Sequence, residues 1–274
     1  MRYNVLGRTD LQLSHVSLGG ATFSNIYGNF EEDRFMQLIK ESLQSGINYL
    51  ETGPWYGQGS SEKTIGKVHD ATFAPDTSIV LKETLPALER AVRDGKARYI
   101  GLADYDIDLM KELVEESEVK ISSILSYSKS TLFDNRLQNY TKYFKDKGVG
   151  VINAAATGMG LLCNSGPQPW HPASDDIKAL CKRASEYCKE QNVELGRLAT
   201  WFTLNQPDID TNICGICNLD QLRDTLKIEE TGLTEHEKRV LAEVQIRFFN
   251  NLTLHWDGVE LPKYKSKLNG IRSK

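Results

Sequence analysis

Short apolar segments alternate with longer amphipathic segments along most of the chain. Six segments rich in valine, isoleucine and leucine are typical of buried parallel strands. They are Val16–Gly20, Ile47–Leu50, Tyr99–Leu102, Ile121–Leu125, Val149–Ile152 and Ile213–Ile216. The segments between them place apolar residues at helical spacing. These stripes run over Phe35–Leu43, Leu85–Val92, Leu109–Val114, Ile177–Ala184 and Leu198–Phe202. Strand then helix, without a linker rich in proline, glycine or serine, predicts one α/β domain with a parallel sheet.

The two ends of the chain lie outside this alternation. Residues Tyr3–Leu13 predict a short β-hairpin whose turn is Arg8–Asp10. Thr234 and Glu237 have the spacing of a capping box, which predicts a terminal helix through Phe248. The segment after this helix is interpreted as a loop that becomes a solvated end.

Composition restricts the class of protein further. Lys and Arg number 33 against 37 Asp and Glu, a formal net charge of -4, so the basic excess of a nucleic-acid-binding surface is missing. The sequence has no apolar run near the roughly 20 residues that cross a bilayer, and Met1–Leu13 lacks the apolar core of a signal peptide. We therefore expect a cytoplasmic protein with neither a nucleic-acid nor a membrane partner.

The motifs of several common enzyme classes are missing from the sequence. It contains no G-x-G-x-x-G or P-loop glycine pattern, no H-E-x-x-H zinc motif and no G-x-S-x-G nucleophile turn. Cys214 and Cys217 have the spacing of a metal or redox pair, but strand residues three apart point to opposite faces. We therefore expect no metal site.

The segment Gly46–Gly66 carries the clearest candidate chemistry. A predicted strand ends in the carboxylate of Glu51, and Tyr56 follows in a glycine-flanked loop. A doubly wound sheet and a closed barrel both produce the alternation of strand and helix described above. In a barrel, catalytic groups gather at the carboxyl ends of the strands, where Glu51 and Tyr56 would lie.

Strings in this segment and across the chain resemble the aldo-keto reductases, most closely the branch that includes L-galactose dehydrogenase and bacterial aldose dehydrogenases. They are Leu6–Thr9, Pro54–Gly59, Glu83–Glu89, Gly95–Gly101, Gly148–Asn153, Gly158–Leu162, Trp170–Ala173 and Ala184–Lys189. The resemblance implies an eight-stranded (β/α) TIM barrel that binds NADPH or NADH without a Rossmann domain. It also implies a small carbonyl or aldose as substrate.

The resemblance assigns roles to individual residues. Tyr56 matches the residue that donates a proton to the carbonyl oxygen, and His69 matches the histidine that orients this oxygen. Glu51 stands where the family has aspartate. The positions that the resemblance places at the cofactor are Gly20, Ala21, Thr22, Asp104, Ser126, Leu161, Gly215, Asn218, Gln221 and Asp224.

The chain departs from the family pattern after Gly66–Val68. Family chains place a third strand, a helix and a fourth strand there, and the third strand carries a lysine that lowers the pKa of the tyrosine. Here the segment runs directly into His69–Asp70. We expect a single domain over residues 1–274, with a barrel truncated to about six strands at 13–230 and the terminal helix and tail at 234–274. Such a barrel either closes with a smaller diameter, is completed by another chain, or keeps open sheet edges that favour self-association.

Two functions follow from these matches and departures. The first is an oxidoreductase linked to NADP(H) or NAD(H), weakly bound, with Tyr56 as the proton donor. The alternative is a catalytically inactive, shortened relative that binds nucleotide or a protein partner. It rests on the missing lysine, on Glu51, on Ala103, and on Gln221 where an arginine often reads the NADPH 2′-phosphate. A phenol without a neighbouring lysine titrates near 10, which weakens acid catalysis at neutral pH.

Overall fold

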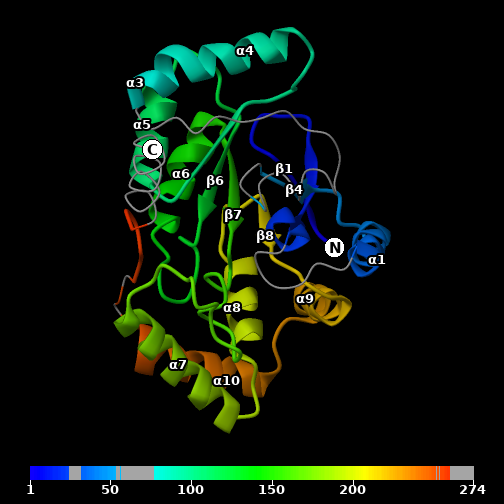
Figure 1. Cartoon of the computed structure of the whole chain (residues 1–274), viewed down its shortest axis with the longest axis vertical. Helices are drawn as coiled ribbons and strands as arrows, with labels where there is room; N and C mark the ends of the chain where they lie inside the picture. Colours follow the sequence, from blue (N-terminus) through cyan, green and yellow to red (C-terminus); the bar gives the residue numbers. More distant parts are fainter. Residues whose placement is uncertain (25–31, 54–55, 57–76, 251, 253, 260–274) are drawn as a thin grey trace, which may run out of the picture.

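A parallel sheet of six strands lies at the centre of the computed structural model, which describes residues 1–24, 32–53, 56, 77–250, 252 and 254–259 (Figure 1). In chain order the strands are β3 (Val16–Gly19), β4 (Leu50–Glu51), β5 (Gly101–Asp104), β6 (Ser123–Tyr127), β7 (Gly150–Ala154) and β8 (Thr211–Cys214). Their spatial order is β4-β3-β8-β7-β6-β5, and every neighbouring pair is parallel. These strands correspond to the six apolar segments of the sequence, with boundaries shifted by at most three residues.

The strand order is that of a barrel opened at one place. In a closed (β/α) barrel each strand pairs with its neighbours in the chain. Here β4 and β5 follow one another among the described strands, yet they lie at the two opposite edges of the sheet. The opening therefore falls where the sequence predicted the loss of two strands, and the prediction of a barrel-derived fold with about six strands is confirmed. Self-association through these edges stays a prediction, as does the single-domain division at 13–230 and 234–274.

The amino-terminal hairpin fills one end of the half-barrel. Strands β1 (Tyr3–Val5) and β2 (Gln12–Ser14) pair antiparallel, as the sequence predicted. Leu6 and Leu13 pack against Ile152 and Ile213, whose side chains project into the interior of the sheet. Gly7 adopts φ +52, and a Cβ there would lie 2.4 Å from the Gly150 backbone nitrogen. Glycine is therefore required where the hairpin meets β7.

Helices surround the sheet (Figure 1). The longer ones are α1 (Glu32–Gln44), α4 (Leu85–Arg93), α5 (Ile107–Glu116), α6 (Gln138–Lys147), α7 (Asp175–Glu190), α8 (Leu195–Leu204), α9 (Leu219–Thr231) and α10 (Glu235–Val244). The described residues also include four short helical segments: η1 (Gly20–Phe23), α3 (Thr77–Ile79), η3 (Val80–Thr84) and η4 (Gln245–Phe249). The capping box of Thr234 and Glu237 is present at the start of α10, and the terminal helical segment ends at Phe249.

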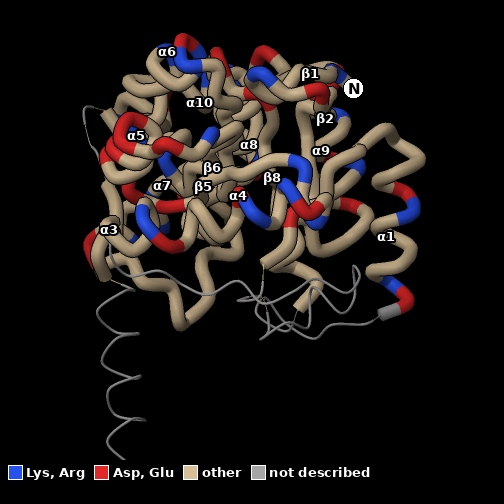
Figure 2. The backbone as a smooth tube through the Cα atoms, turned by 90° about the horizontal axis from the view of Figure 1, so that it is seen from above, with Lys and Arg blue, Asp and Glu red and all other residues tan. Residues whose placement is uncertain are grey.

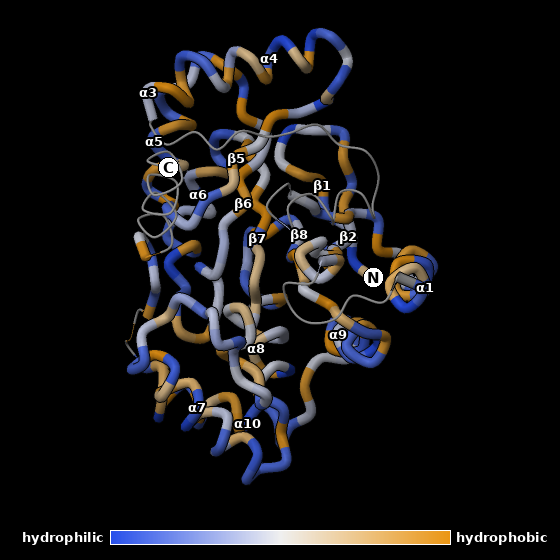
Figure 3. The backbone as a smooth tube through the Cα atoms, viewed as in Figure 1, coloured by the Kyte–Doolittle hydropathy of each residue, from blue (hydrophilic) through white to orange (hydrophobic). Residues whose placement is uncertain are grey.

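Apolar residues concentrate along the strands and on the inward helix faces (Figure 3). One cluster joins β3 to α1 and α9, a second joins β6 and β7 to α5 and α6, and a third holds α7, α8 and α10 together with Trp256. Charged residues of both signs lie around the outside of the molecule (Figure 2). Within the described residues, every helix is too short or too polar to span a bilayer.

A buried ion cluster ties the first residues of the chain to α9. The Glu229 side chain is 2% exposed, and its oxygens accept hydrogen bonds from Arg2 Nε at 2.8 Å and from His15 Nδ1 at 2.9 Å. Burial alone would raise the pKa of Glu229, but the hydrogen bonds from Arg2 and His15 lower it to about 2. The ionised carboxylate therefore stabilises the fold.

The substitution Glu229→Gln is expected to lower the free energy of unfolding by about 3 kcal/mol at neutral pH. The folded pKa of about 2 lies below the ordinary value of 4.5, so this stabilisation is complete above pH 4.5 and is lost as the pH falls towards 2. Urea denaturation of both proteins across this pH range measures the difference. The exposed neighbour provides the control, Glu230→Gln. A loss that did not shrink on acidification would contradict the assignment.

Candidate active site

A cavity of about 670 Å³ opens at the carboxyl ends of the strands. The last residues of β3, β4, β6, β7 and β8 all line it: Gly19, Glu51, Tyr127, Ala154 and Cys214. Further parts of the wall come from Tyr56, the segment after β3, the loops after β7 and β8, and helices α8 and α9. This volume lies within the range of ordinary small-molecule sites, and the position is the one that barrel enzymes use.

Glu51 and Tyr56 form a hydrogen-bonded pair in the cavity wall. The Tyr56 hydroxyl donates to Glu51 Oε1 at 2.8 Å, and the Gly20 backbone N–H points to Oε2 at 3.4 Å. Glu51 is placed by the parallel pairing of β3 with β4, which sets it opposite Gly19. Tyr56 is placed by a turn in which its backbone N–H donates to the Gly53 carbonyl at 3.0 Å. The two side chains that the sequence proposed as catalytic are thus brought together.

The surroundings of this pair disfavour negative charge. Burial raises the pKa of Glu51, and the hydrogen bonds from Tyr56 and Gly20 offset only part of this rise. Burial and the neighbouring Glu51 raise the pKa of Tyr49 to about 12. A larger share of Glu51 is therefore protonated at neutral pH than of an exposed glutamate. The pair is able to pass a proton between carboxyl and phenol.

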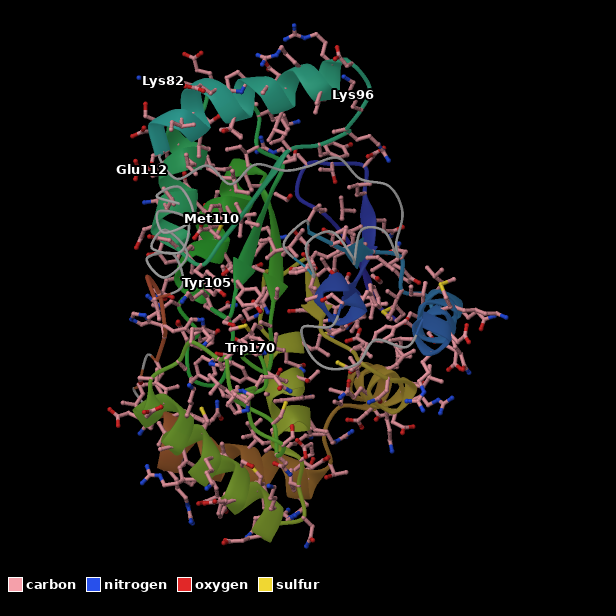
Figure 4. The ribbon with its side chains drawn as sticks, in the orientation of Figure 1. Lys82, Lys96, Tyr105, Met110, Glu112 and Trp170 are labelled. Carbon is pink, nitrogen blue, oxygen red and sulfur yellow. The ribbon has the colours of Figure 1, made fainter. Side chains whose placement is uncertain are left out.

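An aromatic pair stands beside the cavity on the β5 and β6 side. Tyr105 follows β5 (Figure 4). Its ring packs edge to face on that of Tyr127, with 4.9 Å between the ring centroids. Tyr127 itself lines the cavity. Among the described residues, no three acidic, histidine or cysteine side chains converge as a set of metal ligands.

Arg197, on α8, lies at another part of the wall and was missed by sequence reasoning. Its side chain forms ion pairs with Asp224 of α9 and, at 2.8 Å, with Glu237 of α10. Among the lining residues that the structure describes, Arg197 is the only one with a cationic side chain. Its partners lie 27 and 40 residues away in the chain, so only the packing of three helices brings the group together.

Some of the residues proposed for the cofactor line the cavity, and others lie next to it or away from it. Five of them line the cavity: Ala21, Thr22, Gly215, Gln221 and Asp224. Two others act next to it. Gly20 is the backbone donor to Glu51, and Asn218 caps α9 by accepting a hydrogen bond from the Gln221 N–H at 2.9 Å.

Three proposed cofactor residues lie away from the lining, and the proposed catalytic residue His69 lies outside the described residues. Ser126 is fully buried, while the strand neighbours Leu125 and Tyr127 face the cavity. Leu161 packs in the cluster of α7, α8 and α10. Asp104 accepts the Asp106 N–H at 2.9 Å, and burial raises the pKa of its carboxyl group. His69 belongs to the residues that the structure does not describe.

The cavity has features that suit an extended dinucleotide. Barrel proteins commonly hold phosphate with the loops after strands seven and eight and the start of the following helix. Here the corresponding loops after β7 and β8 contribute small residues, among them Ala154–Ala156, Gly160 and Gly215, and α9 begins beside them. Small side chains leave the backbone open to close approach by a ligand. The described residues thus fit a nicotinamide dinucleotide in size and position.

The sequence matches known proteins over most of its length. A profile of the Aldo/keto reductase family matches residues 71–246. L-galactose dehydrogenase of Arabidopsis thaliana is 27% identical over 297 aligned residues, covering 88% of this chain and 92% of the relative. D-arabinose 1-dehydrogenase of Saccharomyces cerevisiae is 24% identical, and the alignment covers 86% of this chain and 91% of the relative. Aldo-keto reductase YhdN of Bacillus subtilis is 32% identical, and the alignment covers 87% of this chain and 92% of the relative. The first of these alignments is longer than the 274-residue chain, so that relative has residues without a counterpart here.

Solved structures agree on the fold. A glycerol dehydrogenase from Gluconobacter oxydans superposes with a TM-score of 0.65 at 17% identity, covering 91% of this chain and 96% of that chain. A thermostable aldo-keto reductase gives a TM-score of 0.61 at 21% identity, with coverage of 89% and 100%. The half-barrel is therefore similar in architecture to aldo-keto reductases along most of its length.

The substitution Glu51→Gln is expected to raise the free energy of unfolding at neutral pH. Because the folded pKa lies above the ordinary 4.5, the wild-type protein loses stability as the pH rises through this interval, and the amide does not. Thermal denaturation of both proteins from acid to neutral pH measures a gain that grows with pH. The exposed acid of α7 serves as the control, Glu190→Gln. Equal stability of the Glu51 variant and wild type at every pH would show that Glu51 is not held at a destabilising site.

Proposed function

Because the chain belongs to the aldo-keto reductase family, we propose that it is an NAD(P)(H)-linked oxidoreductase of a small aldehyde, ketone or aldose with Tyr56 as its proton donor. The observation that carries this proposal is the 2.8 Å hydrogen bond between Tyr56 and Glu51 in a cavity at the carboxyl ends of the strands. An aldose is the favoured substrate class, since two similar relatives are named L-galactose dehydrogenase and D-arabinose 1-dehydrogenase.

Tyr56 and Glu51 share the proton transfer in the proposed reaction. When bound, a nicotinamide supplies the hydride to the carbonyl carbon or accepts it from the alcohol carbon. In reduction, the Tyr56 hydroxyl gives its proton to the carbonyl oxygen and receives the carboxyl proton of Glu51. In oxidation, Tyr56 takes the proton of the substrate hydroxyl as the Glu51 carboxylate takes the phenolic proton. The raised pKa of Glu51 suits both directions, because a general acid–base group works best with a pKa near the operating pH.

Glu51 thereby takes a different part from the lysine that the family places beside its tyrosine. A lysine lowers the pKa of the phenol through its positive charge. Glu51 has no positive charge to offer, so the proposed chemistry runs through the proton relay between Glu51 and Tyr56. The proposed site therefore needs Glu51 to exchange its proton with solvent between turnovers.

A second candidate is a relative that binds dinucleotide without turnover. It is favoured by the composition of the wall, in which the charged lining residues that the structure describes are Glu51, Glu194, Asp224 and the ion-paired Arg197. A protein of this kind would keep the cavity and lose the chemistry.

The substitution Tyr56→Phe tests the proposed reaction. It is expected to lower turnover of aldoses and aldehydes by about 10²–10⁴-fold, because it removes the proton donor, while the dissociation constant for NADH or NADPH stays within about twofold. Fluorescence titration measures binding, and absorbance of the reduced nicotinamide measures turnover. A partly buried tyrosine of α6, outside the described lining residues, supplies the matched control, Tyr143→Phe.

The wild-type result separates the two candidates. Saturable dinucleotide binding with turnover that Tyr56→Phe abolishes supports the enzyme. Binding without turnover of any aldose, aldehyde or ketone supports the inactive relative. Turnover that survives in Tyr56→Phe would contradict the role of the phenol.

A further inference from the structure

We propose that the free edge of β5 is the docking site for β5 of a second copy of this chain, with the two strands antiparallel about a twofold axis. Three features of β5 carry this proposal: its exposure, the backbone groups at its free edge, and the opposite charges at its two ends. The pairing joins two half-barrels at one sheet edge and is independent of the proposed function.

β5 is far more exposed than the strands at the centre of the sheet. Three of its four residues are exposed, whereas every residue of β3, β7 and β8 is buried. Strands of a parallel sheet are ordinarily buried on both faces. Among the strands that the structure describes, β6 is the only partner of β5, so the other side of β5 is an edge. An exposed edge of this kind favours pairing with a further strand.

The backbone of β5 presents hydrogen-bonding groups at this edge. Just before the strand, the Ile100 carbonyl accepts the N–H of Ser122, which precedes β6, at 2.8 Å. Successive residues of a strand turn their N–H and C=O groups alternately to the two sides, so Gly101 and Ala103 present theirs to the open side. Proteins commonly block an edge with proline, lysine or a bulge. Residues 101–103 contain neither proline nor lysine, so the edge is open to a second strand.

The other edge strand, β4, is a poorer docking site. It has only two residues, Leu50 and Glu51, and both are half-buried. A very short edge strand is one of the ways in which proteins limit edge pairing. A head-to-tail pairing of β5 with β4 of the next chain is therefore disfavoured. Pairing of β5 with its own copy uses the same surface twice and closes as a dimer.

The charges around β5 select the antiparallel orientation. Lys96 lies before the strand and Tyr105 after it (Figure 4). Residues 93–98 carry three basic side chains and one acidic side chain, whereas residues 104–108 carry three acidic side chains, all of them exposed. An antiparallel pair sets the basic end of each strand beside the acidic end of the other. A parallel pair would bring the two acidic ends together, and like charges at an interface repel.

The basic side chains already have partners, but these contacts are weak. Lys96 pairs with Asp94 at 3.4 Å, and Arg98 pairs with Asp10 of the hairpin at 2.5 Å. All four side chains are more than half exposed, and exposed ion pairs contribute little to stability. With both acids counted, the amino end of β5 keeps one positive charge in excess. The basic side chains are therefore available to the acidic end of a second copy.

The helix before β5 adds apolar surface beside the strand. Leu85 of α4 belongs to one apolar cluster with Ile100 and Leu102, and Leu88 of the same helix is 41% exposed. Because β5 has only four residues, we expect an interface at the small end of the range for specific complexes. The dimer should therefore be weak, with a dissociation constant in roughly the micromolar range.

Sedimentation velocity of the full-length protein over about 1–100 μM tests the pairing. We expect a shift from monomer to dimer with concentration, and a weaker dimer as salt is added. The substitution Ala103→Pro should raise the dissociation constant at least about tenfold, because proline lacks the N–H at the open edge. This N–H faces away from β6, so the substitution spares the pairing within the sheet. Far-UV circular dichroism checks that the variant is folded.

Charge reversal tests the orientation and does not depend on Ala103→Pro. Lys96→Glu and Asp108→Lys should each raise the dissociation constant at least about tenfold at low salt, because each places like charges together in its own dimer. An equimolar mixture of the two variants should associate more tightly than either alone, since the mixed dimer joins opposite charges at both ends. The matched control is Lys182→Glu on α7, whose side chain is 77% exposed, with an expected change below about twofold.

Three results would overturn the proposal: a monomer throughout the concentration range, a dimer that Ala103→Pro leaves unchanged, or a mixture of charge variants that associates no more tightly than each variant alone. Species larger than a dimer would also contradict it, because a twofold pair of edges closes on itself. None of these results bears on the proposed function, since they concern association and not turnover.

Discussion

The parallel pairing of β3 with β8 holds the half-barrel together and positions both ends of the cavity. Val16, Ser17 and Leu18 lie opposite Asn212, Ile213 and Cys214. The Ser17 and Thr211 hydroxyls share a buried hydrogen bond of 2.6 Å, and a Cβ on Gly19 would approach an Ile213 methyl carbon to 2.9 Å. From this pair, β4 brings Glu51 to one part of the cavity and the chain after Cys214 leads into α9 at another. A shift of register here would move Glu51 and Tyr56 relative to the wall that α8 and α9 form.

An opened barrel requires other means of filling its interior. In this chain the amino-terminal hairpin inserts Leu6 and Leu13 against β7 and β8, and the cluster of Arg2, His15 and Glu229 fixes the strand that follows. These contacts lie at the amino ends of the strands, opposite the cavity. The stabilising contacts therefore lie at the amino ends of the strands and the cavity at their carboxyl ends, as in closed barrels. The carboxyl end is free to keep a buried Glu51 whose environment costs stability.

The sequence predicted those features that depend on local patterns. Six apolar segments became the six strands, the hairpin formed, and Thr234 and Glu237 capped α10 as their spacing indicated. Helix α6 was not predicted, because its residues Gln138–Lys147 are mostly polar and bury only Thr141 and Phe144. The Tyr56 and Glu51 pair followed from the family resemblance and the strand end. Arg197 could not be predicted in this way, because its two ion-pair partners lie on other helices and are brought to it only by the tertiary fold.

Burial and charge compensation act at separate parts of the cavity wall to disfavour added negative charge. At the carboxyl end of β4, burial raises the pKa of Glu51 and of Tyr49. Burial also raises the pKa of the lining thiol of Cys163 to about 11. At the α8 wall, Arg197 is outnumbered by its carboxylate partners. Such a cavity suits a neutral carbonyl or polyol beside Tyr56, because an anionic substrate would meet desolvation without a free cation to offset it. In the proposed function, this balance of charge favours an uncharged sugar as the substrate.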